Sequence, residues 1–206
     1  MENKPLEDPR IDFFDSIAGA WDGWHDLPAL AKRLDAEFDG FGIRASETVL
    51  DVGCGTGNLT LNLLNRLGSG GRVTALDISQ VMLDRAQEKI RDPRVTWMRA
   101  SADRIPVADA SCDRIICFSS WPHFVDPVAV VREFRRVLRS DGNAHILHLI
   151  SREEVNRIHG QGHPSVRADQ LKPVQETAGL FERDGFKLVA MADDSGRYLL
   201  TVRKGS

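Results

Sequence analysis

The sequence has few cysteines, no long apolar segment and no large excess of charge of either sign. Its three cysteines, Cys54, Cys112 and Cys117, are too few and too irregularly spaced for a disulfide framework or a cysteine-rich zinc site. No apolar run approaches the ~20 residues that a membrane helix needs, and the acidic start MENKPLEDPRIDFFDS lacks the apolar core of a signal peptide. A net charge of −3 provides no general attraction to nucleic acid or anionic lipid. We therefore expect a cytoplasmic protein with buried free thiols that binds neither nucleic acid nor membranes.

Length and composition indicate one folded domain. The chain has 206 residues, of which 42% are hydrophobic and 28% are charged. These are ordinary globular values, so disorder, a collagen helix and a coiled coil are excluded as the main state. We predict a single domain over residues 1–206, present as a monomer or a homodimer.

From residue 47 onward, short apolar runs alternate with segments of helical periodicity. The runs predicted to be strands are, in order, ETVLDVG, RVTALDI, RVTWMRA, DRIICFSS and AHILHLI. Between them apolar residues recur at helical spacing, as Met82, Ala86 and Ile90 do. The helix that contains Leu138 is expected to end at residues 141–142, where a glycine can adopt a left-handed cap. This alternation predicts right-handed βαβ units and a parallel sheet with helices on both faces.

The end of the chain departs from this alternation. The last two apolar runs, FKLVAMA and RYLLTVR, are separated only by DDSG. A parallel crossover needs about a dozen residues, so these two strands must form an antiparallel hairpin. The sequence thus predicts an α/β fold: a Rossmann-like three-layer sandwich around a mostly parallel seven-stranded sheet with a C-terminal antiparallel hairpin.

Two segments flank or interrupt this pattern and are candidate lids. Residues 1–46 precede the first strand and are expected to be helical, and residues 151–167 link the fifth strand to the last helix. The cofactor-binding core would then span residues 47–150, and residues 168–206 would form the C-terminal helix and hairpin. Ligands of open α/β sheets bind beyond the carboxyl ends of the strands, and both lid segments can reach that edge.

A glycine loop joins the first strand to the first helix of the predicted core. Gly53, Gly55 and Gly57 allow a tight turn and the close approach of a ligand to the backbone. A tight turn without a ligand is the simpler interpretation of such a loop. A dinucleotide fingerprint would require glycine at position 58, which is Asn58, and a Walker A loop would require a GK[ST] ending, which is absent.

Asp77 ends the second strand, next to this loop in a parallel sheet. A carboxylate at this position can accept hydrogen bonds from both hydroxyl groups of a ribose. The alternative is that Asp77 caps the helix that begins near Ser79.

Several motifs together carry a resemblance to a known family. The segments D-V-G-C-G-T-G, A-L-D-I-S and M-L-D-R-A resemble those of class I S-adenosylmethionine-dependent methyltransferases. Residues 105–113, IPVADASCD, and residues 132–142, REFRRVLRSDG, are similar to two further segments of the family. FFDSIAGAWD, residues 13–22, is similar to the lid of the ubiquinone and menaquinone methyltransferases, with Trp21 in place of a tyrosine. The resemblance is close over roughly residues 47–150.

The resemblance implies S-adenosylmethionine as cofactor and a set of residues that bind it. Ser101 departs from the family pattern, because it stands where the family usually has an aspartate that contacts the adenine edge. A serine hydroxyl can still accept a hydrogen bond from the adenine amine. The implied cofactor-binding residues are Asp51, Gly53, Gly55, Gly57, Asp77, Ile78, Met82, Ser101, Ala102 and Ser119.

Methyl transfer from a sulfonium is an in-line displacement, so the protein mainly aligns the reactants and excludes water. A base is needed only where the acceptor must lose a proton. Histidine is the natural base near neutral pH, and His123 and His148 follow or end strands at the expected catalytic edge. We take both as candidate catalytic residues. The alternatives are a packing role in a loop for His123 and a hydrogen-bonded core histidine for His148, whereas we interpret His145 as structural.

The acceptor would contact residues of the lids and of the loop after the fourth strand. The candidates are Trp21, His25, Trp121, His159 and His163. His148, His159 and His163 could in principle bind a metal ion, but the two glycines of HGQGH make a regular helical spacing of the ligands doubtful. We therefore predict no metal site.

The function that follows is S-adenosylmethionine-dependent methyl transfer to a small-molecule acceptor. The short lids and the lack of a basic face disfavour a nucleic-acid acceptor. The alternative from another class is a non-catalytic S-adenosylmethionine-binding or scaffold protein with the same fold. A nicotinamide oxidoreductase is a weaker alternative, which Asn58 and the terminal hairpin disfavour.

Overall fold

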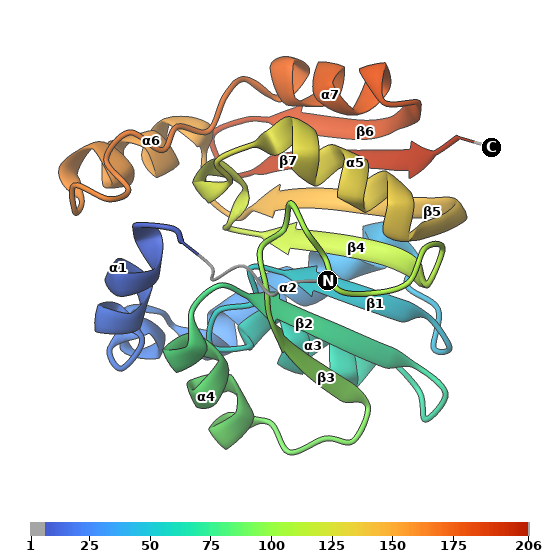
Figure 1. Cartoon of the computed structure of the whole chain (residues 1–206), viewed down its shortest axis with the longest axis horizontal. Coiled ribbons are helices and arrows are strands. Elements are labelled where there is room, and N and C mark those ends of the chain that lie inside the picture. The colour runs from blue at the N-terminus through green and yellow to red at the C-terminus, as the bar shows by residue number, and fades with distance from the viewer. Residues whose placement is uncertain (1–6, 206) are drawn as a thin grey trace.

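A twisted sheet of seven strands runs through the middle of the computed structural model, which describes residues 7–205 (Figure 1). The strand order is β3-β2-β1-β4-β5-β7-β6. β7 pairs antiparallel with both of its neighbours, and all other pairs are parallel. The predicted mostly parallel sheet with a terminal hairpin is therefore confirmed. The strands are β1 (Thr48–Val52), β2 (Arg72–Asp77), β3 (Val95–Arg99), β4 (Cys112–Phe118), β5 (Leu138–His148), β6 (Phe186–Asp193) and β7 (Tyr198–Lys204).

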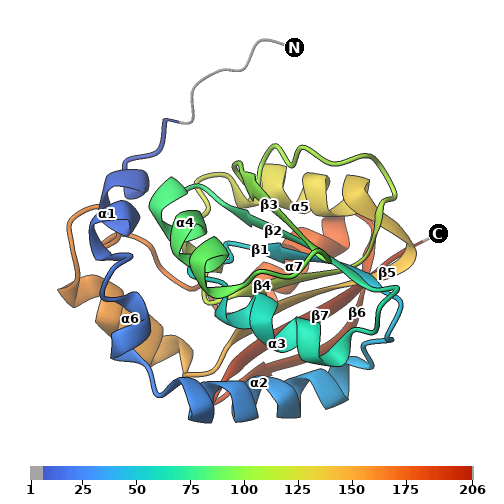
Figure 2. The ribbon, with the colours of Figure 1, turned by 90° about the horizontal axis from the view of Figure 1, so that it is seen from below.

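Helices cover both faces of the sheet and thereby complete the three layers (Figure 2). One apolar cluster joins the sheet to α2 (Leu27–Phe41), α3 (Asn58–Arg66) and α4 (Gln80–Lys89). A second cluster joins the opposite face to α5 (Pro127–Val137) and α7 (Val174–Arg183). Because both faces are covered, successive residues of a central strand can all be apolar, and Ile115, Ile116 and Cys117 of β4 are all fully buried.

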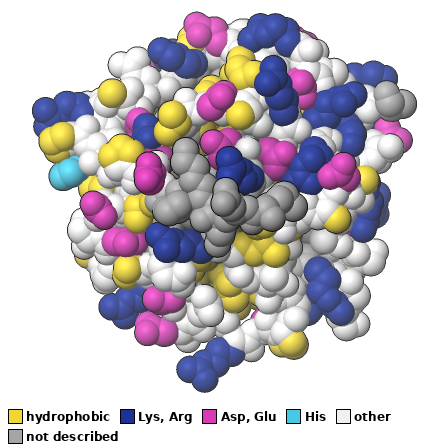
Figure 3. Space-filling model, in the orientation of Figure 1, with side chains coloured by type: hydrophobic (Ala, Val, Ile, Leu, Met, Phe, Trp, Pro, Cys, Tyr) yellow, Lys and Arg dark blue, Asp and Glu magenta, His cyan; other side chains and the backbone are white. Residues whose placement is uncertain are grey.

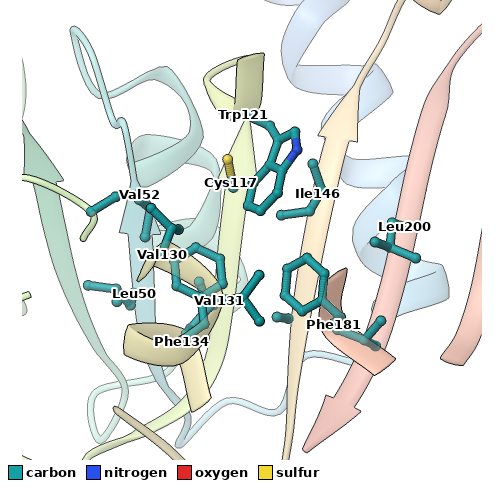
Figure 4. Packing of buried hydrophobic residues seen from close by; sticks show 14 of the residues in the cluster. Leu50, Val52, Cys117, Trp121, Val130, Val131, Phe134, Ile146, Phe181 and Leu200 are labelled. Atoms are coloured by element: carbon teal, nitrogen blue, oxygen red, sulfur yellow. The ribbon is translucent and has the colours of Figure 1, made fainter. Parts of the chain in front are cut away.

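The second cluster is rich in aromatic rings. Phe134 of α5 and Phe181 of α7 lie over β4 and β5, and Trp121 lies beside Ile146 at the end of these strands (Figure 4). The Trp121 ring centroid is 5.5 Å from that of Phe181 and 6.4 Å from that of Phe134. These contacts fix the direction in which the chain leaves β4, so they position the loop that follows it.

The boundary between α5 and β5 corrects one prediction from the sequence. The helix ends at Val137, and Leu138 already pairs with Cys112 as the first residue of β5. The left-handed residue is Asp141, with φ +61°, and not Gly142. A Cβ at Gly142 would lie 3.0 Å from the carbonyl oxygens of Arg139 and Asp113, so this glycine allows close packing of the backbone and does not cap a helix.

Two helices lie beyond the carboxyl ends of the parallel strands. α1 (Arg10–Ile17) and α6 (Arg152–Gln161) are found at this edge in both views (Figures 1 and 2). The short 3-10 helices η1 (Trp21–Trp24) and η2 (Trp121–His123) continue from α1 and from β4. Of the two segments proposed as lids, α1 and η1 of residues 1–46 and α6 of residues 151–167 are therefore at the edge where ligands of such sheets bind. In contrast, α2 of the first segment packs on a face of the sheet, and residues 1–6 lie outside the described part of the chain.

The surface charges and the character of the helices are described next. Over the face seen in Figure 3, lysine and arginine side chains are interspersed with aspartate and glutamate side chains. Within residues 7–205, none of the helices combines the length and the apolar character that crossing a membrane would require.

The packing of α5 predicts how substitutions on this helix change the free energy of unfolding. Phe134→Ala removes a side chain that is 0% exposed, and it should lower the free energy of unfolding by about 3–5 kcal/mol because a cavity remains. Val128→Ala, on the same helix but 44% exposed, should change it by less than about 0.5 kcal/mol. Urea denaturation of the two variants measures the difference, and equal effects would contradict the assigned packing.

Candidate cofactor and acceptor site

A cavity of about 680 Å³ opens at the carboxyl edge of the sheet, between the strand ends and the N-terminal helices. Its wall contains residues from the glycine loop, from the ends of β2, β3 and β4, and from α1, η1 and α2. The structure thus brings together most of the candidate residues from the sequence. Those that line the cavity are Trp21, His25, Asp51, Gly53, Gly55, Asp77, Ile78, Met82, Ser101, Ala102, Ser119 and His123.

The glycine loop is held against β2 and leaves one side of its backbone open to the cavity. The backbone amides of Gly53 and Cys54 donate to the carbonyl of Leu76, at 2.8 and 3.0 Å. A Cβ at Gly53 would lie 2.4 Å from Cβ of Ser120, so only glycine fits there. Gly55 has φ +52°, and a Cβ on it would have no atom within 4 Å, so a ligand can approach its backbone directly.

Asp77 connects this loop to the start of α4. Its Oδ2 accepts from the amide of Gly55 at 2.8 Å, and its Oδ1 accepts from the amide of Ser79 at 2.9 Å. The cap of α4 is Ser79, whose hydroxyl accepts from the amide of Met82 at 3.0 Å. Asp77 is therefore not the helix cap, and it lines the cavity while only 9% exposed.

Asp51 is the second buried carboxylate of the cavity and is 1% exposed. Its Oδ2 accepts from the hydroxyl of Thr60 at 2.6 Å, whereas its Oδ1 has no hydrogen-bond partner among the described residues. Burial raises the pKa of Asp51 to about 7, against the opposing hydrogen bond from Thr60, and the nearby charge of Asp77 adds to the rise. Burial also raises the pKa of Asp77 itself.

The two buried carboxylates indicate that the cavity favours a positively charged ligand. Within residues 7–205, neither Asp51 nor Asp77 forms an ion pair. Buried carboxylates without a cation are costly. A ligand that brings positive charge and hydrogen-bond donors to this end of the cavity would relieve that cost.

His123 is held in the cavity wall by the loop that follows β4. Ser119 starts this loop with φ +55°, a conformation that non-glycine residues rarely adopt. Nδ1 of His123 lies 2.8 Å from Oδ2 of Asp169, a residue that lies between α6 and α7 and is 6% exposed. Sequence reasoning missed Asp169, because no motif surrounds it and its partner is 46 positions away.

The other candidate base, His148, lies behind the cavity wall. It is 2% exposed, its Nε2 has no partner among the described residues, and its ring meets that of Tyr198 edge-on at 5.9 Å. Burial lowers the pKa of His148 to about 3, so the ring is neutral at physiological pH. A catalytic role for His148 stays a prediction that the cavity does not support directly.

Two further candidates pack against protein and do not line the cavity. Trp121 is 6% exposed and belongs to the aromatic cluster with Phe134 and Phe181 (Figure 4). Gly57 has φ +81° at the start of α3, and a Cβ there would lie 3.2 Å from Cβ of Ala86. Both residues therefore support the site through packing.

The two histidines of the second lid contact different segments. Nδ1 of His159 lies 2.7 Å from the carbonyl oxygen of Asp169, and the ring of His163 stacks on Phe13 at 5.1 Å. His145 is buried against Arg114 and is structural in this fold, as its place in the strand suggested. No cluster of three or more histidine, cysteine, aspartate or glutamate side chains suited to a metal ion occurs in residues 7–205.

Aromatic side chains from several elements also line the cavity. Trp21 contacts the ring of His25 at 5.5 Å. The sequence analysis did not single out several other residues of this wall, because they lie on ordinary helical or loop segments. These are Phe14, Leu30, Arg33, Phe118, Phe124 and Ile150.

Comparison with known proteins agrees with this geometry. A family model described as a methyltransferase domain matches residues 49–142. The demethylmenaquinone methyltransferase of Lactobacillus johnsonii is 31% identical over 154 residues, which cover 71% of this chain and 63% of that protein. The ubiquinone/menaquinone biosynthesis C-methyltransferase UbiE of Klebsiella pneumoniae is 33% identical over 141 residues, which cover 65% of this chain and 56% of that protein.

The chain thus covers less than two thirds of the length of either curated relative. Among solved structures, a chain from the complex between the Haloferax volcanii Trm112 methyltransferase activator and a methyltransferase shares the fold. Its TM-score is 0.77 at 18% identity, over 98% of this chain and 100% of that chain. With the matched domain, the two relatives and the sheet order in agreement, this chain belongs to the class I S-adenosylmethionine-dependent methyltransferases.

Proposed function

We propose that this protein transfers a methyl group from S-adenosylmethionine to a small, hydroxylated ring compound. The observation that carries the proposal is a single cavity that brings together His123, aromatic side chains and two buried carboxylates, Asp51 and Asp77, which form no ion pair among the described residues. The names of the two relatives, which are quinone-pathway methyltransferases, support a ring compound as acceptor.

The residues of the carboxylate end fit S-adenosylmethionine. When bound, this cofactor supplies an activated methyl group on a sulfonium, and it also carries an ammonium group and two ribose hydroxyls. The unpartnered Oδ1 of Asp51 is suited to the ammonium, and Asp77 at the end of β2 is suited to the ribose. The open side of Gly55 leaves room for the methionine part. Ile78 and Met82 provide apolar surface for the adenine.

The adenine edge would meet residues after β3. Ser101 and Asp103 both line the cavity there, so a hydroxyl and a carboxylate are available as acceptors for the adenine amine. This part of the cavity therefore has polar groups even though Ser101 departs from the family pattern.

The contribution of the protein to the reaction is alignment, exclusion of water and removal of a proton. The aromatic wall formed by Phe14, Trp21 and Phe124 would hold a flat ring and keep water away from it. His123 uses Nδ1 toward Asp169, so its Nε2 is the nitrogen left to accept a proton from the acceptor. An acceptor hydroxyl deprotonated there becomes the nucleophile or passes its charge to a ring carbon.

Removal of Asp77 tests the cofactor site. Asp77→Ala should weaken S-adenosylmethionine binding by about 1–3 kcal/mol, which is the usual loss for hydrogen bonds to a charged group. Asp84→Ala, an exposed carboxylate on α4, should leave the affinity unchanged. Isothermal calorimetry on folded variants measures both, and an unchanged affinity in Asp77→Ala would remove the assigned ribose contact.

The raised pKa of Asp51 predicts proton release on cofactor binding. At pH 6.5 a carboxyl group with a pKa of about 7 is mostly protonated, and an approaching ammonium group favours its ionised form. Binding should therefore release roughly half a proton or more per S-adenosylmethionine, and the affinity should rise as the pH rises through 7. Calorimetry in buffers of different ionisation enthalpy measures the release, which Asp51→Asn should abolish. Equal release by both proteins would contradict the assignment.

Turnover decides between an enzyme and a binding protein. The purified chain is incubated with S-adenosylmethionine and a panel of hydroxylated aromatic and quinol acceptors. The expected products, detected by mass spectrometry, are S-adenosylhomocysteine and an acceptor that is one methyl group heavier. Cofactor binding without turnover on any acceptor would favour the scaffold alternative, and the absence of binding would contradict both.

A further inference from the structure

One carboxylate connects three segments that are far apart in the sequence. Asp169 accepts from Nε of Arg10 at 2.8 Å and from Nη2 of Arg10 at 2.7 Å, so the two side chains form a bidentate pair. Its Oδ2 also faces Nδ1 of His123 at 2.8 Å. The Arg10, His123 and Asp169 side chains are 13%, 13% and 5% exposed, so water competes little with these bonds.

The charge state of Asp169 determines what His123 can do. Burial alone would raise the pKa of Asp169, but the hydrogen bonds from Arg10 and His123 lower it to about 2. Asp169 is therefore ionised at every physiological pH and can only accept hydrogen bonds. The proton of a neutral His123 ring must then lie on Nδ1, which leaves Nε2 as the free base.

Few other charges reach this ring. The ring of His159 lies 4.8 Å from that of His123, and burial lowers the pKa of His159. His148 is also close enough to be influenced by His123, and burial keeps it neutral. Asp77 is a further carboxylate whose pKa responds to His123. Arg10 and Asp169 are thus the charged pair in direct contact that can orient the ring.

Arg10 belongs to the first lid, and the same helix touches the histidine a second time. Phe14 of α1 meets the His123 ring edge-on at 5.1 Å, and Phe13 stacks on His163 of the second lid. Any movement of α1 away from the cavity would withdraw Arg10 and Phe14 from this site together.

The first lid has a second polar attachment, which joins η1 to the glycine loop. Oδ1 of Asp22 in η1 accepts from the hydroxyl of Thr56 at 2.6 Å and from the side-chain Nδ2 of Asn58 at 3.0 Å, and Nζ of Lys89 lies 2.8 Å from Oδ2 of Asp22. The segment from α1 to η1 therefore joins the glycine loop to the histidine.

We propose that Arg10 is a positioning residue which, through Asp169, fixes the orientation and tautomer of His123, so that closure of the N-terminal lid assembles the base. This inference rests on the proposed function insofar as the base serves methyl transfer. The claim that Arg10 sets the tautomer of His123 does not depend on the identity of any acceptor.

The direct test is the tautomer of His123, measured by nitrogen NMR on protein labelled at the histidine rings, with His123→Gln for assignment. In the unmodified chain at pH 8, the ring proton should reside on Nδ1. The fraction with this tautomer should fall in Arg10→Met and fall further in Asp169→Ala. Arg157→Met removes an exposed arginine of α6 that pairs only with its own helix, and it should leave the tautomer unchanged.

Kinetics and hydrogen exchange supply the second part of the test. Arg10→Met should lower kcat by roughly 10-fold or more, which is part of the ~10²–10⁴-fold that a general base contributes, while the Kd for S-adenosylmethionine stays the same, and Arg10→Lys should recover part of the loss. In Asp169→Ala the amides of α1 should exchange faster, because the lid loses its anchor.

An unchanged tautomer together with an unchanged kcat in Arg10→Met would overturn the inference. If the unmodified chain methylates no acceptor, the proposed function fails, and the tautomer and exchange measurements alone decide whether the lid positions the histidine. Loss of S-adenosylmethionine binding in Arg10→Met would also overturn it, because the residue would then act on the cofactor site.

Discussion

Burial of Asp51 and Asp77 without a compensating cation is the constraint on which the site depends. Both carboxylates lie where adjacent parallel strands end, and one oxygen of Asp51 has no partner among the described residues. Such an arrangement lowers the stability of the unliganded protein. A ligand that supplies positive charge and hydrogen-bond donors would offset this loss of stability. The glycine loop provides the open backbone beside which such a ligand can lie. The sheet holds both groups rigidly, so the ligand meets a site that is already formed.

The cavity is built from two kinds of segment. Residues 49–142, which match the methyltransferase domain, contain the glycine loop and the ends of the first four strands. Further lining residues come from the preceding helices and from the segment after β5, as Trp21, Arg33 and Ile150 do. The two carboxylates proposed to hold the donor thus lie in the matched domain, and segments outside that domain complete the wall.

The flanking segments also contact each other. Arg10 of the first lid pairs with Asp169, which lies two residues beyond the second lid, and His123 shares the same carboxylate. If His123 acts as the proposed base, its orientation would depend on contacts made by the first lid. The other polar anchor, Asp22, connects the lid to the glycine loop. The segment from α1 to η1 therefore contacts both the glycine loop and the ring of His123.

Local physics made much of this protein predictable from its sequence. A short connection forces the hairpin of β6 and β7, glycines with positive φ form the loop, and an aspartate ending a parallel strand must reach the same edge. The sequence could not show that Arg10 meets Asp169 across 159 positions. Nor could it show that Trp121 turns into the aromatic core, or that α5 ends at Val137. Those outcomes depend on which surfaces meet when the sheet and helices pack, and contacts between distant segments leave no periodic signal in the chain.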